Sequence, residues 1–164
     1  MEPKWLSEDE RVAWVQLAAV TELLPGALDS QLRRDADLTF YEYYVLAMLS
    51  EAPQRTLQMT ALAARTNATL SRLSHVVTRL ADRGLVERFT CPEDRRATNA
   101  TLTATGWAKV QESAPGHVAT VREHVIDKLT FDQVRQLVAI TGALLTSLDP
   151  DGNVTRKAVL NQVR

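Results

Sequence analysis

Apolar residues near the middle of the chain recur with the period of a helix and predict one helix with a single buried stripe. Within residues 69–83 they stand at i, i+3, i+4 and i+7, the spacing that places side chains on one helical face. Gly84 follows directly and is a natural terminator, because glycine readily adopts the left-handed conformation found at helix ends. The residues of the stripe are Leu73, Val76, Val77 and Leu80.

The polar side of this predicted helix carries hydrogen-bond donors and, until Asp82, no acidic residue. A surface helix selected only for solubility normally includes Glu and Lys, whereas arginine and hydroxyl donors suit an anionic groove. We therefore predict that this face binds DNA. Alternatives stay open for two residues, because Arg79 could pair with Asp82 or Glu87, and His75 could pack in the core. The predicted DNA-binding residues of the helix are Ser71, Arg72, Ser74, His75, Thr78 and Arg79.

The residues before this helix predict a second, shorter helix joined to it by a tight turn. Residues 60–65 are mostly small, and Thr60 is a favourable N-cap. Asn67 stands where the turn needs a left-handed residue, a conformation that asparagine tolerates better than most. Two helices joined in this way form a helix-turn-helix, whose second helix enters the major groove of DNA.

The residues after the helix predict a small β wing. Segments 85–89 and 100–103 are rich in β-forming residues and are expected to pair, and Leu57 with Met59 could add a short edge strand. The loop at 90–99 between the paired strands carries Arg95 and Arg96. Guanidinium groups suit the narrow minor groove or the flanking phosphates, so we interpret this loop as a DNA-contacting wing.

Capping boxes at Ser7, Thr39 and Thr130 predict further helices that start at these residues. Pro25–Gly26 predicts either one kinked helix or two consecutive helices, and Pro115–Gly116 predicts a kink or a break. The helices at the two ends of the chain have too few neighbours to bury both of their faces. We therefore expect them to pack against a second copy of the chain, a compact monomer being the alternative.

These motifs together resemble the MarR (multiple antibiotic resistance regulator) family of transcription factors. The resemblance implies a single domain over 1–164, mainly α with a small β wing. Its winged helix-turn-helix lobe covers 38–103, and its dimerisation helices cover 7–34 and 104–149. By the family pattern, Asp94 braces Arg96, and Arg96 reaches the minor groove. The residues that carry the resemblance are Leu62-Ala63, Ser71 to Leu80, Arg83 to Arg88, Asp94-Arg95-Arg96, Leu102-Thr103 and Gly106.

The same resemblance implies a dimeric repressor that binds a palindromic operator in double-stranded DNA. Release from DNA would follow binding of a small-molecule effector, often an aromatic acid in this family. The implied effector pocket lies between the first, second and fifth helices, and core packing is the alternative role for each residue assigned to it. Those residues are Trp14, Tyr43 and His117.

Charge along the chain supports DNA binding, although the net charge of the 164 residues is only −1. Residues 54–96 contain eight basic and four acidic residues, and this excess of positive charge coincides with the predicted helix-turn-helix and wing. The aromatic content of 5% argues against a single-strand binder that stacks bases. No apolar segment is long enough to span a membrane, and we expect a cytoplasmic, nucleoid-associated protein.

Other classes of chemistry find little support in the sequence. Cys91 at the wing base could be a redox sensor or an inert thiol. His117 and His124 lie seven residues apart, too far for one metal without further ligands, so we expect neither metal nor cofactor. No nucleophile elbow or phosphate-binding glycine loop is present, which argues against an enzyme. The alternative to DNA binding is a winged-helix module that binds another protein.

Overall fold

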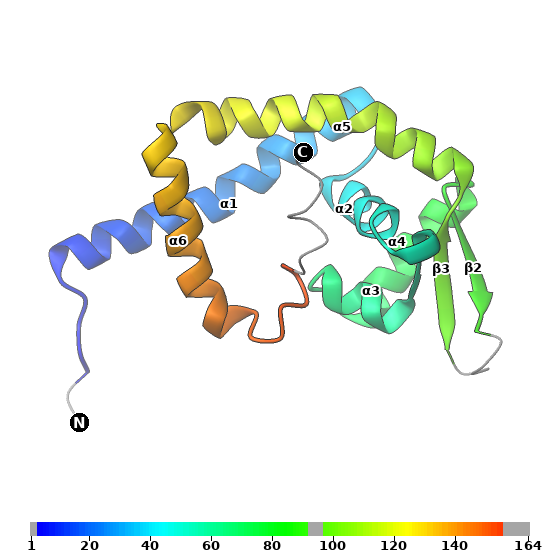
Figure 1. Cartoon of the computed structure of the whole chain (residues 1–164), viewed down its shortest axis with the longest axis horizontal. Helices are drawn as coiled ribbons and strands as arrows, with labels where there is room; N and C mark the ends of the chain where they lie inside the picture. The colour runs from blue at the N-terminus through cyan, green and yellow to red at the C-terminus, as the bar shows by residue number, and fades with distance from the viewer. Residues whose placement is uncertain (1–2, 92–96, 156–164) are drawn as a thin grey trace.

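The computed structural model describes residues 3–91 and 97–155, and it is mainly helical with one small sheet (Figure 1). The expected fold class, mainly α with a small β wing, is therefore confirmed. The helices are α1 (Glu8–Ala36), α2 (Phe40–Ser50), α3 (Met59–Arg65), α4 (Leu70–Asp82), α5 (Ala104–His124) and α6 (Phe131–Leu148), with 3₁₀ turns η1 (Pro53–Arg55) and η2 (Ile126–Lys128). The strands are β1 (Thr56–Gln58), β2 (Val86–Thr90) and β3 (Thr98–Leu102).

Side-chain caps start most of the helices where the sequence predicts them. Complete capping boxes at Ser7, Thr39 and Thr130 begin α1, α2 and α6. The start of α3 differs from the prediction that Thr60 is its N-cap. Here β1 leads directly into the helix, so Gln58 is the N-cap and Met59 is buried in the first turn instead of extending the strand.

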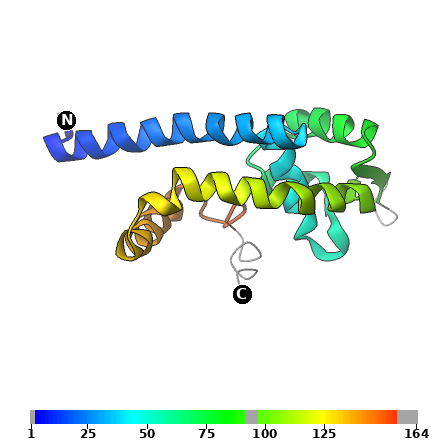
Figure 2. The same cartoon turned by 90° about the horizontal axis from the view of Figure 1, so that it is seen from above.

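The prolines do not divide the long helices, so the break considered at Pro115–Gly116 is wrong. Both α1, which contains Pro25, and α5, which contains Pro115, are continuous. Figure 2 shows the two helices running side by side, and they pack against each other. Each proline removes one backbone hydrogen bond, and packing between the helices, together with the intact neighbouring turns, offsets this loss.

A compact lobe at one end of the molecule contains α2, α3, α4 and the sheet. The antiparallel sheet has the strand order β1-β3-β2. Asn67 (φ 48°) and Gly84 (φ 70°) hold the predicted left-handed positions on either side of α4. The predicted apolar stripe of α4 is buried in the core of this lobe, with side-chain exposures of 9% or less. Gly106 lets α5 pass close to the lobe, since a Cβ there would collide with the carbonyl oxygen of Leu85.

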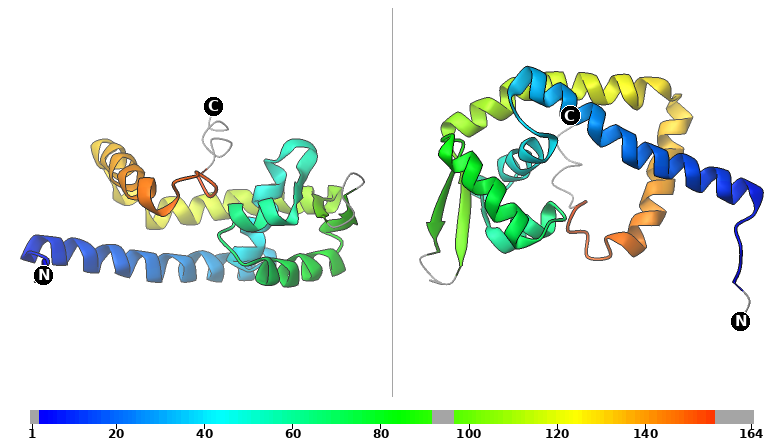
Figure 3. Two further views of the ribbon diagram at one scale, coloured as in Figure 1. Left: turned by 90° about the horizontal axis from the view of Figure 1, so that it is seen from below. Right: turned by 180° about the vertical axis from the view of Figure 1, so that it is seen from behind.

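The first half of α1 and all of α6 lie on the side of the molecule away from the wing (Figures 1 and 3). No residue of α6 is buried. Large apolar side chains of both helices are exposed, as expected for helices that cannot bury both faces within one chain. They include Val12, Trp14, Val15, Val20, Leu23, Phe131, Val138, Ile140, Leu144 and Leu148.

Within residues 3–91 and 97–155, no helix is long and apolar enough to cross a bilayer. The same residues contain no cluster of three or more His, Cys, Asp or Glu side chains arranged to hold a metal ion.

Candidate nucleic-acid interface

The donor face of α4 is turned away from the core. The side chain of Thr69 caps the helix by accepting from the backbone N–H of Arg72 (3.2 Å). Of the six residues predicted to bind DNA, Ser74 is half-buried and the other five are exposed. The exposed five are Ser71, Arg72, His75, Thr78 and Arg79. The core role considered for His75 is therefore wrong, because its side chain lies on the surface.

A groove lies between α4, the start of α3 and the two wing strands. Its volume is about 380 Å³, and it is lined by Gln58, Met59, Thr60, Leu70, Ser74, Arg88, Ala97 and Thr98. Arg88 from β2 spans from the wing to the helix, where its Nη1 donates to the Thr78 hydroxyl (3.0 Å). That hydroxyl in turn donates to the Ser74 carbonyl (2.9 Å). The sequence alone does not indicate a DNA contact for Arg88, because only strand pairing places this residue beside α4.

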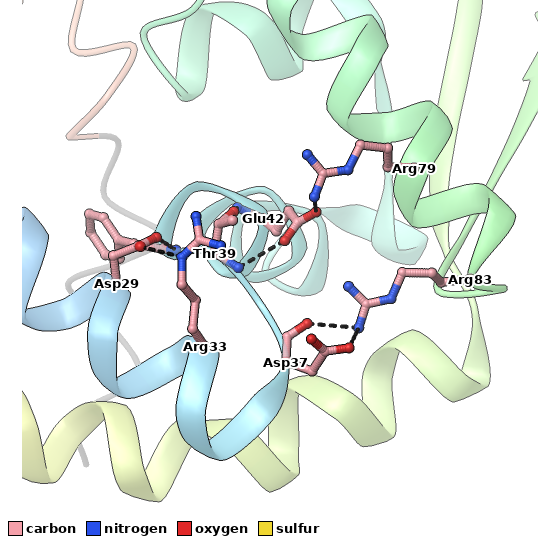
Figure 4. Close-up of polar contacts among 8 residues, drawn as sticks. Asp29, Arg33, Asp37, Thr39, Glu42, Arg79 and Arg83 are labelled. Carbon is pink, nitrogen blue, oxygen red and sulfur yellow. Dashed lines mark hydrogen bonds and ion pairs between the residues drawn. The ribbon is translucent and has the colours of Figure 1, made fainter.

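The second half of α4 is fixed to the corner between α1 and α2 (Figure 4). Arg79 Nη2 lies 2.7 Å from Oε1 of Glu42, a carboxylate that is only 2% exposed. Glu42 is also the third residue of α2, where its Oε2 accepts from the Thr39 backbone N–H (2.8 Å). The alternative considered from the sequence, an ion pair of Arg79 with Asp82 or Glu87, is therefore wrong. The partner of Arg79 is Glu42, 37 positions earlier in the sequence.

A second arginine strengthens this connection. Arg83 Nη2 donates to the backbone carbonyl of Asp37 (2.8 Å) and lies 3.4 Å from its carboxylate (Figure 4). Asp37 ends α1 in the left-handed conformation, with φ 51°. The last turn of the predicted recognition helix is thus tied to the end of α1. Among residues 3–91 and 97–155, no ion pair ties the first turns of α4 to another element, and these turns are the most accessible part of the helix.

Arg72 has a different environment from Arg79 and Arg83. Its guanidinium carbon lies 4.3 Å from the ring centroid of Tyr41, a residue of α2. Because an arginine that stacks on a ring keeps its N–H groups available, this contact does not use the donors that could bind DNA.

The wing residues Asp94, Arg95 and Arg96 lie outside the described residues, so their assigned roles stay predictions. The base of the wing is described: β2 and β3 pair from Val86 with Leu102 to Thr90 with Thr98. The backbone N–H of Cys91 donates to the carbonyl of Ala97 (2.8 Å) and closes the base. Cys91 is half-buried there, and its redox role is not tested.

Two of the three residues assigned to an effector pocket meet where α2 and α5 pack together. The rings of Tyr43 and His117 lie 4.7 Å apart, and Phe40 lies 6.1 Å from His117. Trp14 is 60% exposed on the first half of α1. It stands 17 residues before Gln31, or about 25 Å along the helix at 1.5 Å per residue. Since Gln31 is the part of α1 that lies against Gly116, the structure does not bring Trp14 to the other two.

Buried polar atoms without partners mark the same junction. Gln31 Oε1 and His117 Nδ1 are both buried, and neither has a hydrogen-bond partner among the residues described. Burial lowers the pKa of His117 below its ordinary value of 6.5, so its imidazole is held neutral. A small polar ligand that donates and accepts could satisfy these atoms.

Comparison with known proteins agrees with this geometry. A sequence model of the MarR family matches residues 36–97, which contain α2 to α4 and part of the wing. The solved structure of Sco3205, a MarR family transcriptional regulator from Streptomyces coelicolor in complex with DNA, is 42% identical to this chain. The similarity covers 91% of this chain and 93% of that one, with a TM-score of 0.86. The chain belongs to the MarR family.

One further MarR family structure and one transcriptional repressor are also similar to this chain. AbsC, a MarR family transcriptional regulator from Streptomyces coelicolor, is 36% identical over 89% of this chain and 98% of its own, with a TM-score of 0.84. The HTH-type transcriptional repressor YetL of Bacillus subtilis is 28% identical over 107 residues. This match covers 65% of this chain and 64% of YetL, so the chain spans just under two thirds of that repressor's length. These relatives are transcriptional regulators and not enzymes.

The ion pair between Glu42 and Arg79 predicts a stability effect. Arg79→Ala leaves a buried carboxylate without its cation, and we expect a loss of about 1–3 kcal/mol in the free energy of unfolding, measured by urea denaturation. Replacing Glu42 with Gln in the Arg79→Ala background keeps the cap, removes the charge and should recover part of this loss. Arg72→Ala, the matched control on the same helix, should cost less than about 1 kcal/mol. Equal losses for both arginines would contradict this role.

Burial of neutral His117 predicts a pH dependence of stability. Below about pH 6.5 the unfolded chain binds a proton that the folded chain excludes, so stability is complete above this pH and falls as the pH decreases. Between about pH 7.5 and 5.5, wild type should lose stability by up to about 1.4 kcal/mol per pH unit more than His117→Gln. His124→Gln, at an exposed position, is the control and should behave as wild type. The same slope in wild type and His117→Gln would show that His117 is not responsible.

Proposed function

We propose that this MarR family member is a sequence-specific repressor that binds double-stranded DNA through α4. The observation that carries the proposal is the outward face of α4. Its hydrogen-bond donors, Arg72 among them, are exposed, and no acidic residue occurs in the helix before Asp82. That face lies beside the groove lined by Arg88. The DNA complex of Sco3205, a relative of 42% identity, supports the same use of this fold.

The geometry favours a binding mode in which each part of the lobe contacts a different feature of the duplex. The first turns of α4 enter the major groove and contact base edges with Arg72, Ser71 and His75. The groove between helix and wing accommodates the phosphate backbone beside Arg88. The assignment of the wing to the minor groove, with Asp94 bracing Arg96, rests on the resemblance to the MarR family, because both residues lie outside the described part of the chain.

The active form is a homodimer built from α1, α5 and α6. The exposed apolar side chains of α1 and α6 support this assembly, because a soluble monomer rarely exposes so large an apolar surface. Two-fold symmetry places the two α4 helices about one turn of duplex apart, so the operator is a palindrome. Because its partner is operator DNA, the protein acts in the cytoplasm, on the nucleoid.

A small aromatic acid bound at the α1–α2–α5 junction is the effector that releases the DNA. The aromatic rings of Tyr43 and Phe40, together with the unsatisfied atoms of Gln31 and His117, support such a ligand. Its binding acts by favouring a dimer geometry in which the two α4 helices no longer match the half-site spacing.

The direct test is selection of duplexes from a randomised library by wild-type protein, followed by fluorescence anisotropy across a salt series. We expect a palindromic consensus and an affinity that decreases steeply with salt. Arg72→Ala should lose about 5- to 150-fold in affinity for the selected duplex if it contacts a base. Arg96→Ala should make the logarithmic salt slope shallower by about one if it contacts a phosphate. Lys128→Ala, at an exposed position of η2 outside α1, α5 and α6, is the control for removal of one positive charge and should bind as wild type.

The outcomes separate the parts of the proposal. A selected site without two-fold symmetry would contradict the dimer, and unchanged binding by Arg96→Ala would contradict the wing assignment. Failure of wild type to bind any duplex at low salt would favour the alternative, a winged-helix module that binds another protein. In the same assay, benzoate should weaken binding of wild type but not of Tyr43→Ala, and equal responses would contradict the proposed effector site.

A further inference from the structure

Arg72 differs from the other described arginines on and beside α4 because its side chain makes no polar contact. Arg79 pairs with Glu42, Arg83 donates to Asp37, and Arg88 donates to Thr78. Among residues 3–91 and 97–155, the Arg72 guanidinium forms no ion pair and donates no hydrogen bond, and its described contact is the ring of Tyr41, 4.3 Å away. Its donors are therefore all available on the exposed face of α4.

Tyr41 is itself held at both ends. Its backbone belongs to the first turn of α2, and its side chain packs against the hydrophobic core. Its phenol oxygen lies 3.0 Å from the hydroxyl oxygen of Thr66. Thr66 is buried at the end of α3, and its hydroxyl also donates to the carbonyl oxygen of Leu62, one turn earlier in that helix (2.8 Å). The ring is thus a fixed surface between α2 and the helix-turn-helix turn.

A fixed ring beneath a guanidinium restricts the guanidinium without using its donors. An exposed arginine side chain samples many rotamers, and ordering it on binding costs affinity. Stacking on an aromatic face selects a subset of rotamers through the cation–π attraction. The plane of the guanidinium and its N–H groups stay free for the O6 and N7 acceptors of guanine, the commonest specific contact of arginine in the major groove.

We propose that Tyr41 is a positioning residue for sequence recognition: it preorders Arg72 for bidentate binding to a guanine in each half-site. This inference rests on the proposed DNA-binding function and assigns one specificity-determining base pair to one side chain. Tyr41 itself lies behind Arg72 and acts through it. Its loss therefore affects discrimination between duplexes more than general attraction to DNA.

The experiment uses full-length protein, the duplex selected by wild type, and a scrambled duplex of equal composition. Tyr41→Leu should weaken binding to the selected duplex by about two- to tenfold. Binding to the scrambled duplex and the salt slope should stay unchanged, because phosphate contacts remain. Tyr41→Phe keeps the ring and should bind as wild type. In the Arg72→Ala background, Tyr41→Leu should add no further loss, since the residue it positions is already absent.

Tyr44→Leu is the matched control. Tyr44 is also on α2, and its phenol also donates to the helix-turn-helix region, at the carbonyl of Arg65 (3.1 Å). No guanidinium stacks on it within the part of the chain that the structure describes. The variant therefore removes a similar support for the lobe while leaving Arg72 on its ring, and it should keep the wild-type ratio of selected to scrambled binding.

Several results would overturn the proposal. These are an equal loss on both duplexes, the same loss in Tyr44→Leu, a full additional loss in the Arg72→Ala background, or a loss in Tyr41→Phe equal to that in Tyr41→Leu. The last would indicate that the bond to Thr66 supports the turn.

Thermal denaturation checks the fold of each variant, and Tyr41→Met replaces Tyr41→Leu if the latter does not fold. Wild type that binds no duplex would refute the proposed function, and the role of Tyr41 with it, whereas normal binding with unaffected Tyr41 variants refutes only the inference.

Discussion

The buried carboxylate of Glu42 is the interaction on which the arrangement of the DNA-binding lobe depends. A carboxylate that is only 2% exposed is costly unless charged or hydrogen-bonding groups compensate it. One oxygen of Glu42 caps the start of α2, and the other pairs with Arg79 of α4. The same side chain therefore begins one helix and fixes the orientation of another.

This constraint divides α4 into two functional halves. The last turns are committed to the protein, because Arg79 and Arg83 bind the corner where α1 becomes α2. The first turns are exposed and present Arg72, stacked on Tyr41, with its donors available. Since Asp37 ends α1, a rigid movement of that corner moves α4 with it. The helix that we propose to contact DNA is in this way joined to α1, a helix of the proposed dimer interface.

Local chemistry explains what the sequence predicts well. The apolar stripe of α4, the capping boxes and the left-handed positions at Asn67 and Gly84 each depend on residues within a few positions of one another. The same helical period also predicts which residues of α4 form its exposed polar face. The resemblance to the MarR family, carried by short motifs, then supplied the arrangement of the lobe.

The features that could not be predicted from the sequence all depend on tertiary contacts. Arg79 finds Glu42 and Arg88 finds Thr78 only because α4 packs between α2 and the wing. Likewise, Pro115 stays within a helix because α5 packs along α1, and Thr60 loses its expected capping role because β1 leads directly into α3. No spacing in the sequence indicates such contacts, since the partners come from different elements.

The claim that the first turns of α4 bind DNA is tested most directly by NMR observation of the backbone amides while the selected duplex is added. We expect the largest changes in residues 69–78 and at Arg88, with residues 131–148 of α6 unchanged. Changes confined to α1 and α6, with none in α4, would contradict the claim that the first turns of α4 form the DNA-binding surface.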